Sequence, residues 1–138
     1  QWVSRTVASA TPAQREALEL PRGARVARLE RLRLADGVPM AYECSAVVLS
    51  ALPKPQALDG SLYLHLARSG HAPVRAVQHI RAVNAPPAMA EQLQIAAGDA
   101  LLWVTRTARL ESGVAVEHTQ SWCRSDYYDF VADLRKTP

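Results

Sequence analysis

The sequence is poor in the residues that build disulfide frameworks, metal sites and membrane spans. Its two cysteines, Cys44 and Cys123, form no close pair, and its four histidines show no metal-ligand spacing. No apolar run approaches the roughly 20 residues that a membrane-spanning helix needs, and no signal peptide opens the chain. We therefore expect reduced thiols, no bound metal, no membrane segment and a cytoplasmic location.

The motifs of common catalytic sites are also missing. The sequence has no nucleophile elbow, no glycine-rich loop that would cradle a phosphate, and no paired cysteine and histidine. We therefore expect no catalytic residues, no cofactor and no enzymatic activity.

Basic residues are in slight excess but are not clustered. Lys and Arg together number 16 against 13 Asp and Glu, and the arginines are scattered along the chain. A nucleic-acid surface usually shows a stripe or block of basic residues, so this charge distribution argues against direct DNA contact by this chain.

The length and composition fit one domain. A chain of 138 residues that is 49% hydrophobic can bury a core of its own but is too short for two ordinary domains. Because the chain begins at Gln1 rather than at methionine, we expect it to be part of a longer protein.

Two stretches of the sequence follow one pattern, beginning at Ala10 and at Ala85. Matching positions are Pro12 and Pro87, Ala13 and Ala88, Glu16 and Glu91, Leu18 and Leu93, Gly23 and Gly98, and Arg31 and Arg106. Each stretch reads as a short helix opened by proline, a glycine stop, a strand, a turn at Asp36-Gly37 or Ser112-Gly113, and a returning strand. The pattern predicts two helix-hairpin repeats in one antiparallel sheet.

The segment between the repeats adds one helix and one strand. Ser61 suits an N-cap, residues 62–69 read as an amphipathic helix, and Gly70 is placed to stop it. Residues 74–83 read as a strand, and residues 49–60 form a proline-bearing loop. The sequence therefore predicts an α+β fold, an antiparallel sheet with flanking short helices.

Side-chain alternation groups polar residues on one face of the expected strands. Alternate residues of a strand share a face, so Arg31 and Arg33 point the same way. On the returning strands the residues that share a face are Glu43 with Ser45, and Glu117 with Thr119, Ser121 and Cys123. If these faces converge, they suit a small polyol anion, because arginine binds phosphate or carboxylate through charge-assisted hydrogen bonds and carboxylates accept from hydroxyls.

The same residues also fit ordinary structural roles. Arginine and glutamate on one strand face are usual on the solvated side of an antiparallel sheet, where ion pairs contribute little. Ser61 needs no role beyond the N-cap, although a helix start beside two arginines is also a place for a phosphate. Tyr127 either lines a pocket or closes the core. Residue patterns alone leave these alternatives open.

Three stretches together resemble a known family. The run "RLRLADGVPMAYE", then "GSLYLHL", then "GVAVEHTQSWCRSDYYDFVADL" is similar to the UTRA domain, the effector-binding module of HutC-type GntR-family bacterial transcription regulators. The resemblance covers residues 9–134. It implies a chorismate lyase-like fold, a homodimer, and an N-terminal winged helix-turn-helix domain, absent from this chain, that would bind operator DNA. Residues 1–8 would then be the linker that follows that domain.

The resemblance also implies roles for individual residues. In sugar-phosphate-sensing relatives two arginines of an R-x-R motif and a serine hold the phosphate, which carries over to Arg31, Arg33 and Ser61. Two glutamates hold the sugar, which carries over to Glu43 and Glu117. The expected ligand-binding set is completed by Tyr63, Ser121, Cys123 and Tyr127. Amino-sugar-responsive relatives tend to read "SYYRGD" where this chain reads "SWCRSD", so Cys123 stands at a position that is often aromatic.

The function implied is ligand-controlled repression. A small-molecule effector would shift the population between DNA-competent and DNA-incompetent dimers. An amino-sugar phosphate such as N-acetylglucosamine 6-phosphate is the favoured ligand, while other sugar phosphates, phosphonates and carboxylates stay open. A chorismate lyase-like enzyme and a pure dimerisation module are the alternative functions.

Overall fold

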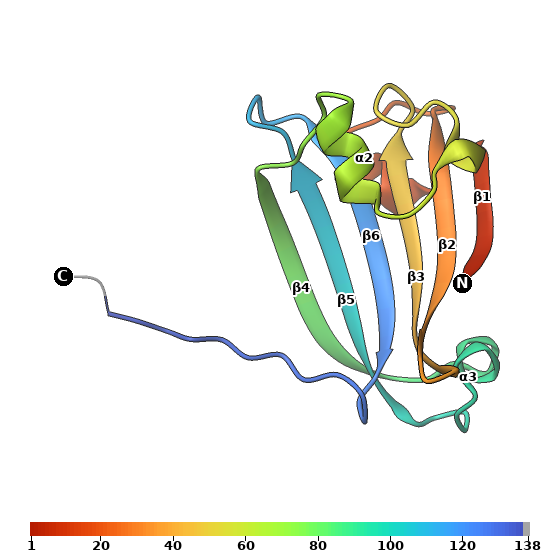
Figure 1. The fold of residues 1–138 in the computed structure, drawn as a ribbon. Coiled ribbons are helices and arrows are strands. Elements are labelled where there is room, and N and C mark those ends of the chain that lie inside the picture. Colours follow the sequence, from red (N-terminus) through yellow and green to blue (C-terminus); the bar gives the residue numbers. More distant parts are fainter. Residues whose placement is uncertain (137–138) are drawn as a thin grey trace.

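The computed structural model describes residues 1–136, which form one six-stranded antiparallel sheet with short flanking helices (Figure 1). The strands are β1 (Trp2–Ser9), β2 (Arg25–Ala35), β3 (Val38–Val48), β4 (Arg75–Asn84), β5 (Ala100–Arg109) and β6 (Ala115–Arg124). The helices are α1 (Pro12–Leu18), the 3-10 turn η1 (Pro55–Ala57), α2 (Leu62–Arg68) and α3 (Pro87–Leu93). The strand order is β1-β2-β3-β6-β5-β4. The expected α+β fold with an antiparallel sheet is confirmed.

Two hairpins meet at the centre of the sheet. Asp36 and Gly37 join β2 to β3 and both have positive φ, 49° and 78°, which is the geometry of a tight hairpin turn matched to the strand twist. β5 and β6 form the second hairpin through a longer connection that contains Gly113. Because β3 pairs with β6, the two hairpins lie next to one another, and polar residues of both share one face.

The helices before the hairpins end earlier than their glycines. The expected stops at Gly23 and Gly98 are wrong, because α1 and α3 end at Leu18 and Leu93 and are capped by Glu19 and Gln94, both with φ 55°. In each case the amide of the following residue bonds to the carbonyl five residues back, at 2.9 Å in α1 and 3.0 Å in α3. These closing hydrogen bonds hold a non-glycine residue in the left-handed conformation.

The structure corrects the expectation that residues 1–8 form a linker. Residues 2–9 are strand β1, which pairs with β2 from Trp2 opposite Arg31 to Ser9 opposite Arg25. Without β1 the backbone groups of β2 would lack partners on that side, so the pairing satisfies them. It also brings the start of the chain beside Arg31.

The sheet is covered differently on its two faces. α2 and the loop before it lie over one face (Figure 1), above a core of Ala27, Leu29, Val47, Ala51, Leu52, Leu58, Leu66 and Val116. α1 and α3 pack on the other face, where their buried leucines, Leu18 and Leu93, contact separate small clusters. The face under α2 is the one that carries the arginines and glutamates of both hairpins.

The chain after β6 leaves the sheet. Residues 129–136 form no helix or strand, and Figure 1 shows them running away from the body on the side of β4. Phe130, Val131 and Leu134 are exposed along this segment. Within residues 1–136, the helices are all too short and too polar to cross a membrane.

Candidate ligand-binding site

A cavity of about 540 Å³ lies between the start of α2 and the sheet. It is lined by Gln1, Trp2, Arg31, Arg33, Glu43, Ser45, Gly60, Ser61, Leu62, Tyr63, Arg106, Glu117, Thr119 and Ser121. Seven of these were expected from the sequence, namely Arg31, Arg33, Glu43, Ser61, Tyr63, Glu117 and Ser121. The polar faces of the two hairpins therefore do converge.

Strand register explains the convergence. Residues directly opposite one another in antiparallel strands project from the same face of the sheet. Arg31 on β2 lies opposite Glu43 on β3, which lies opposite Ser121 on β6. Two residues further along β3, Ser45 lies opposite Thr119 on β6. These rows run across the floor of the cavity.

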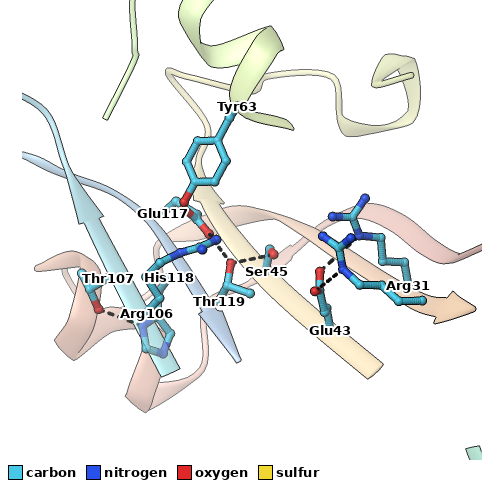
Figure 2. Close-up of polar contacts among 10 residues, drawn as sticks. Arg31, Glu43, Ser45, Tyr63, Arg106, Thr107, Glu117, His118 and Thr119 are labelled. Carbon is cyan, nitrogen blue, oxygen red and sulfur yellow. Dashed lines mark hydrogen bonds and ion pairs between the residues drawn. The ribbon is translucent and has the colours of Figure 1, made fainter. Parts of the chain in front are cut away.

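Glu43 lies between the two arginines of the R-x-R motif. Its Oε2 accepts a hydrogen bond from Arg31 Nε at 3.2 Å, and its Oε1 accepts one from Arg33 Nε at 2.5 Å. Figure 2 shows the Glu43 carboxylate aimed at the Arg31 guanidinium. Burial opposes the charge on Arg33, but the hydrogen bond and charge of Glu43 outweigh it and raise the pKa of that guanidinium. Glu43 is thus an internal counter-ion for both cations.

The terminal guanidinium nitrogens of Arg31 and Arg33 make no side-chain hydrogen bond within residues 1–136. Within residues 1–136, neither Arg31 nor Arg33 forms an ion pair or a side-chain hydrogen bond other than the Nε contact with Glu43. Arg31 also stacks on the ring of Trp2, 5.5 Å from its centroid, which fixes the direction of the guanidinium. Two oriented guanidinium edges are left at the cavity wall as hydrogen-bond donors for an anion.

A second cluster forms around Glu117, which is fully buried. Its Oε2 accepts from the Tyr63 hydroxyl at 2.6 Å, and its Oε1 accepts from Arg106 Nη2 at 3.2 Å and from the Thr119 hydroxyl. Ser45 extends the chain of hydrogen bonds, 2.7 Å from Thr119. Figure 2 shows Tyr63 reaching from α2 down to this carboxylate. We call Tyr63, Arg106, Glu117 and Thr119 the Glu117 cluster.

The Glu117 cluster ties α2 to the sheet. Burial, followed by the hydrogen bond to Glu117, raises the pKa of Tyr63 above its ordinary value, so the hydroxyl stays protonated and donates. Arg106 lies over the Tyr63 ring at 5.1 Å and adds a cation–π contact. Because protein donors hold both oxygens of Glu117, this carboxylate positions Tyr63 and Arg106 at the wall of the cavity. Its expected contact with a sugar stays a prediction.

Ser61 caps α2 and still has a free donor. Its hydroxyl oxygen accepts from the Leu64 amide at 3.3 Å, which confirms the expected N-cap. The hydroxyl hydrogen is not used in that bond and is available to a ligand oxygen. The capping role and the ligand-binding role are therefore compatible in one side chain.

Two expected site residues lie outside the cavity lining. Cys123 shares the face of Glu117 but is buried against Ala41 and Val104, where burial raises the pKa of its thiol to about 11. Its packing in this cluster leaves it only 3% exposed. Tyr127 follows the end of β6, is exposed, and stacks against Arg124. Its neighbour Tyr128, rather than Tyr127, packs against the Cys123 cluster.

Several lining residues were missed from the sequence. They are Gln1, Trp2, Ser45, Gly60, Leu62, Arg106 and Thr119. Signals for three of them were present, because the repeat matches Arg106 to Arg31, and alternation groups Ser45 with Glu43 and Thr119 with Glu117. Trp2 could not be found while residues 1–8 were interpreted as a linker.

The opposite face of the sheet carries a hollow of different chemistry. It measures about 500 Å³ and is lined by Ala13, Glu16, Ala17, His79, Arg81, Trp103, Thr105, His118 and Gln120. Burial lowers the pKa of His118, which favours its neutral form. Across the described range 1–136, the His, Cys, Asp and Glu side chains form no group of three that could hold a metal ion. The paired arginines distinguish the first cavity as the candidate anion site.

Comparison with known proteins identifies the family of this chain and agrees with its fold. The family model for the UTRA domain matches residues 1–129. The HTH-type transcriptional repressor NagR of Bacillus subtilis is 35% identical over 107 residues, which cover 75% of this chain and 44% of the repressor. This chain thus spans less than half the length of that protein.

Solved structures give the same result. A GntR-family transcriptional regulator from Enterococcus faecalis superposes with a TM-score of 0.89 at 30% identity, covering 97% of this chain and 99% of the other. The effector domain of PhnF from Mycobacterium smegmatis superposes with a TM-score of 0.89 at 25% identity, covering 98% and 85%. With the family model matching nearly the whole chain, this protein belongs to the UTRA domain family.

Proposed function

We propose that this chain is the effector-binding domain of a GntR-family transcription regulator and that it binds a small phosphorylated sugar in the cavity under α2. The observation that carries the proposal is the pair of oriented arginines, Arg31 and Arg33, at one end of a hydroxyl-lined cavity. The similarity to the repressor NagR and to the PhnF effector domain supports it.

The phosphate end of the site follows from the chemistry of guanidinium groups. Arginine offers parallel N–H donors that match two oxygens of a phosphate. Arg31 and Arg33 have unused terminal nitrogens, and the Ser61 hydroxyl lines the same cavity. We place the phosphate among these three side chains, where it takes over the role that Glu43 has in the ligand-free protein.

The sugar end of the site is the remainder of the cavity. Hydroxyls of Ser45, Thr119 and Ser121 and the donors of the Glu117 cluster line it. Glu43, released from the arginines, would accept from a sugar hydroxyl or amide. A volume of about 540 Å³ lies in the range of small-molecule sites and suits one monosaccharide phosphate such as N-acetylglucosamine 6-phosphate.

Control of DNA binding would come from a shift between two states of a homodimer. The operator would be bound by an N-terminal DNA-binding domain in the longer protein, which acts in the cytoplasm. A ligand changes that equilibrium only through different affinities for the two states. The start of α2 is the element placed to respond, because Ser61 and Tyr63 both line the cavity.

The architecture supports two finer interpretations. α1 with β2 and β3, and α3 with β5 and β6, each consist of a seven-residue helix followed by a hairpin, as two repeats would. The resemblance to a chorismate lyase-like fold is the second. Both are proposals about ancestry and shape, and ligand binding does not depend on either.

Thermal unfolding of the chain against a panel of ligands tests the function. Each sugar phosphate is compared with its unphosphorylated sugar and with inorganic phosphate. At 100 times its dissociation constant a specific ligand adds about 2.7 kcal/mol to the free energy of unfolding. We expect a raised midpoint with a phosphorylated sugar and none with the sugar alone.

A pair of variants tests whether the ligand-induced stabilisation depends on Arg31. Arg31→Ala should abolish the ligand-induced shift without unfolding the domain. Arg28→Ala is the control, since Arg28 lies on the same strand but pairs with Glu30 at 2.8 Å, away from the cavity. An unchanged shift in Arg31→Ala would remove the phosphate assignment.

A further inference from the structure

One row of small side chains crosses the sheet just beyond the floor of the cavity, on the side away from the Glu117 cluster. Arg33 on β2 lies opposite Ala41 on β3, which lies opposite Cys123 on β6. Ala41 and Cys123 come two residues before Glu43 and two residues after Ser121, so they project from the same face as these cavity residues. Because both side chains are small and buried, the row leaves space above it for a larger group.

Tyr128 occupies the space above this row. Its half-buried ring packs against the cluster of Ala41, Val104 and Cys123. The amide of Tyr128 donates to the Arg124 carbonyl at 3.2 Å, and this hydrogen bond turns the chain directly after β6. The ring is therefore held both by its backbone and by the side chains below it, in the row that carries Arg33 at one end.

The Tyr128 hydroxyl is a free donor in the field of the residues proposed to bind the anion. Burial raises the pKa of Tyr128, and the charges of Arg33 and Glu43 act on that pKa in opposite directions. The hydroxyl is therefore protonated near neutral pH. It forms no hydrogen bond with any residue from 1 to 136, and the buried unpartnered atoms of this range are Arg28 Nε and Arg106 Nε. The Tyr128 hydroxyl is thus open rather than sealed in the core.

We propose that Tyr128 is a further binding residue of the cavity, and that its hydroxyl donates a hydrogen bond to the phosphate group of a bound ligand. The inference rests on the proposed sugar-phosphate site and adds to it a donor from outside the two hairpins. Tyr128 lies just outside the lined volume. The contact therefore requires the phosphate to lie at Arg33, where the Glu43 carboxylate lies in the ligand-free protein.

The chemistry of a phosphate monoester leaves a role for such a donor. The group has three terminal oxygens, and each can accept more than one hydrogen bond. The planar edges of Arg31 and Arg33 supply parallel donors from one side only. A neutral phenol adds a directional donor from another side and brings no further charge to a site that already holds two cations. Tyr128 therefore helps to orient the phosphate as well as to hold it.

Isothermal titration calorimetry of Tyr128→Phe tests the contact. The probes are inorganic phosphate and N-acetylglucosamine 6-phosphate. We expect both to bind about tenfold more weakly than to the wild type, equivalent to about 1.4 kcal/mol. Phenylalanine keeps the ring that packs on Cys123, so the thermal midpoint without ligand should stay unchanged. Tyr127→Phe is the matched control, because Tyr127 is the adjacent residue but is exposed and lies over Arg124.

The ionisation of Tyr128 separates a direct contact from an effect of packing. The difference in phenolate absorbance between the wild type and Tyr128→Phe, followed as the pH is raised, reports the titration of this one side chain. A phosphate bound at the hydroxyl opposes the formation of a second negative charge beside it. We therefore expect saturating inorganic phosphate to move this titration to higher pH. A titration that bound phosphate does not move would overturn the contact.

The remaining outcomes separate this inference from the proposed function. Equal affinities of the wild type and Tyr128→Phe, with binding lost in Arg31→Ala, would overturn the role of Tyr128 and leave the sugar-phosphate site in place. An equal loss in Tyr127→Phe and Tyr128→Phe would also overturn it, since the effect would then belong to the chain segment rather than to one hydroxyl. A wild type that binds neither inorganic phosphate nor any sugar phosphate would overturn both proposals.

Discussion

At the scale of single residues, Glu43 decides how the cavity responds to an anion. Its carboxylate holds Arg31 and Arg33 in one direction while no ligand is present. The same carboxylate would repel an incoming phosphate, and in the proposed binding mode the phosphate replaces it at both arginines. A ligand that offers Glu43 new donors, such as sugar hydroxyls, offsets this cost, whereas inorganic phosphate does not. In the proposed binding mode, Glu43 should therefore favour phosphorylated sugars over free phosphate.

Glu43→Gln should reverse this preference. We expect affinity for inorganic phosphate to rise by about tenfold, since the competing charge is removed, and affinity for the phosphorylated sugar to rise less or to fall. Isothermal titration calorimetry measures both. Glu30→Gln is the control, because Glu30 pairs with Arg28 and Tyr42 and does not line the cavity. An unchanged phosphate affinity in Glu43→Gln would contradict the counter-ion role.

Alternation grouped most of the charged residues of the cavity on one face, and the resemblance to the UTRA domain favoured a ligand-binding role over a solvated face. The sequence shows the start or the turn of each element that carries these residues, namely Arg31, Arg33, Glu43 and Ser61. Their positions could therefore be predicted from nearby residues. Trp2 could not be predicted in the same way, because its place depends on pairing between β1 and β2. The expected lining by Cys123 depended on packing depth, which alternation along a strand does not encode.

At the scale of elements, α2 depends on side chains of the sheet for its position. It is only seven residues long, and a helix of that length is marginal without tertiary contacts. Leu66 anchors it in the core below, and Tyr63 joins it to the buried Glu117. Tyr63 lies in the wall of the cavity. A ligand in the cavity would therefore contact the side chain that holds α2 on the sheet.

Tyr63→Phe should weaken this attachment in a pH-dependent way. Loss of a hydrogen bond to a charged group costs about 1.5 to 3 kcal/mol of unfolding free energy near neutral pH. The folded-state pKa of Tyr63 is raised, so the unfolded chain loses this proton first, and its contribution to stability falls as pH rises above about 10. The gap between wild type and variant should therefore narrow above that pH.

Urea unfolding between pH 7 and pH 11 measures the gap. Tyr127→Phe is the control, because the hydroxyl of Tyr127 makes no hydrogen bond with any residue in the range 1–136. Tyr42 and Cys123 also have raised pKa values, but they are present in all the proteins compared and cancel in the difference. A gap that is constant with pH would contradict the assignment.

The elements themselves were largely predictable. Asp36-Gly37 and the alternation around it predicted the first hairpin, and Ser61 and Gly70 predicted α2 between them. β1 was missed because no turn signals bound "WVSRTVAS" in the sequence. It forms a strand because it pairs with β2. The ends of α1 and α3 were missed because backbone hydrogen bonds, rather than a glycine, close those helices.

At the scale of the whole molecule, the sheet separates the candidate cavity from α1 and α3. The candidate effector cavity lies on the α2 face, while α1 and α3 occupy the other. Basic residues stay scattered, in agreement with a domain that senses a ligand and leaves DNA to another part of the protein. If the cavity holds an effector as proposed, we expect its signal to leave through the edges of the sheet or through contact with a second copy.

Operator binding by a full-length regulator that carries this domain should fall when its effector is added. Fluorescence anisotropy with labelled operator DNA measures the change. Arg31→Ala in the same protein should keep the operator affinity of the ligand-free state and lose the response, because the clamp is removed and the DNA-binding part is untouched. An operator affinity that no ligand of the cavity alters would contradict the regulatory proposal.

The stacking of Arg31 on Trp2 has a mechanical consequence. One indole ring is shared by Arg31, at 5.5 Å, and Arg5, at 5.1 Å, and the Gln1 amino group bonds to the Leu32 carbonyl at 2.8 Å. If Arg31 binds an anion as proposed and turns towards it, its guanidinium should move away from the Trp2 ring at the start of β1. Because Gln1 and Trp2 lie directly beside Arg31 and Leu32, a movement of Arg31 would then be felt first at the start of β1.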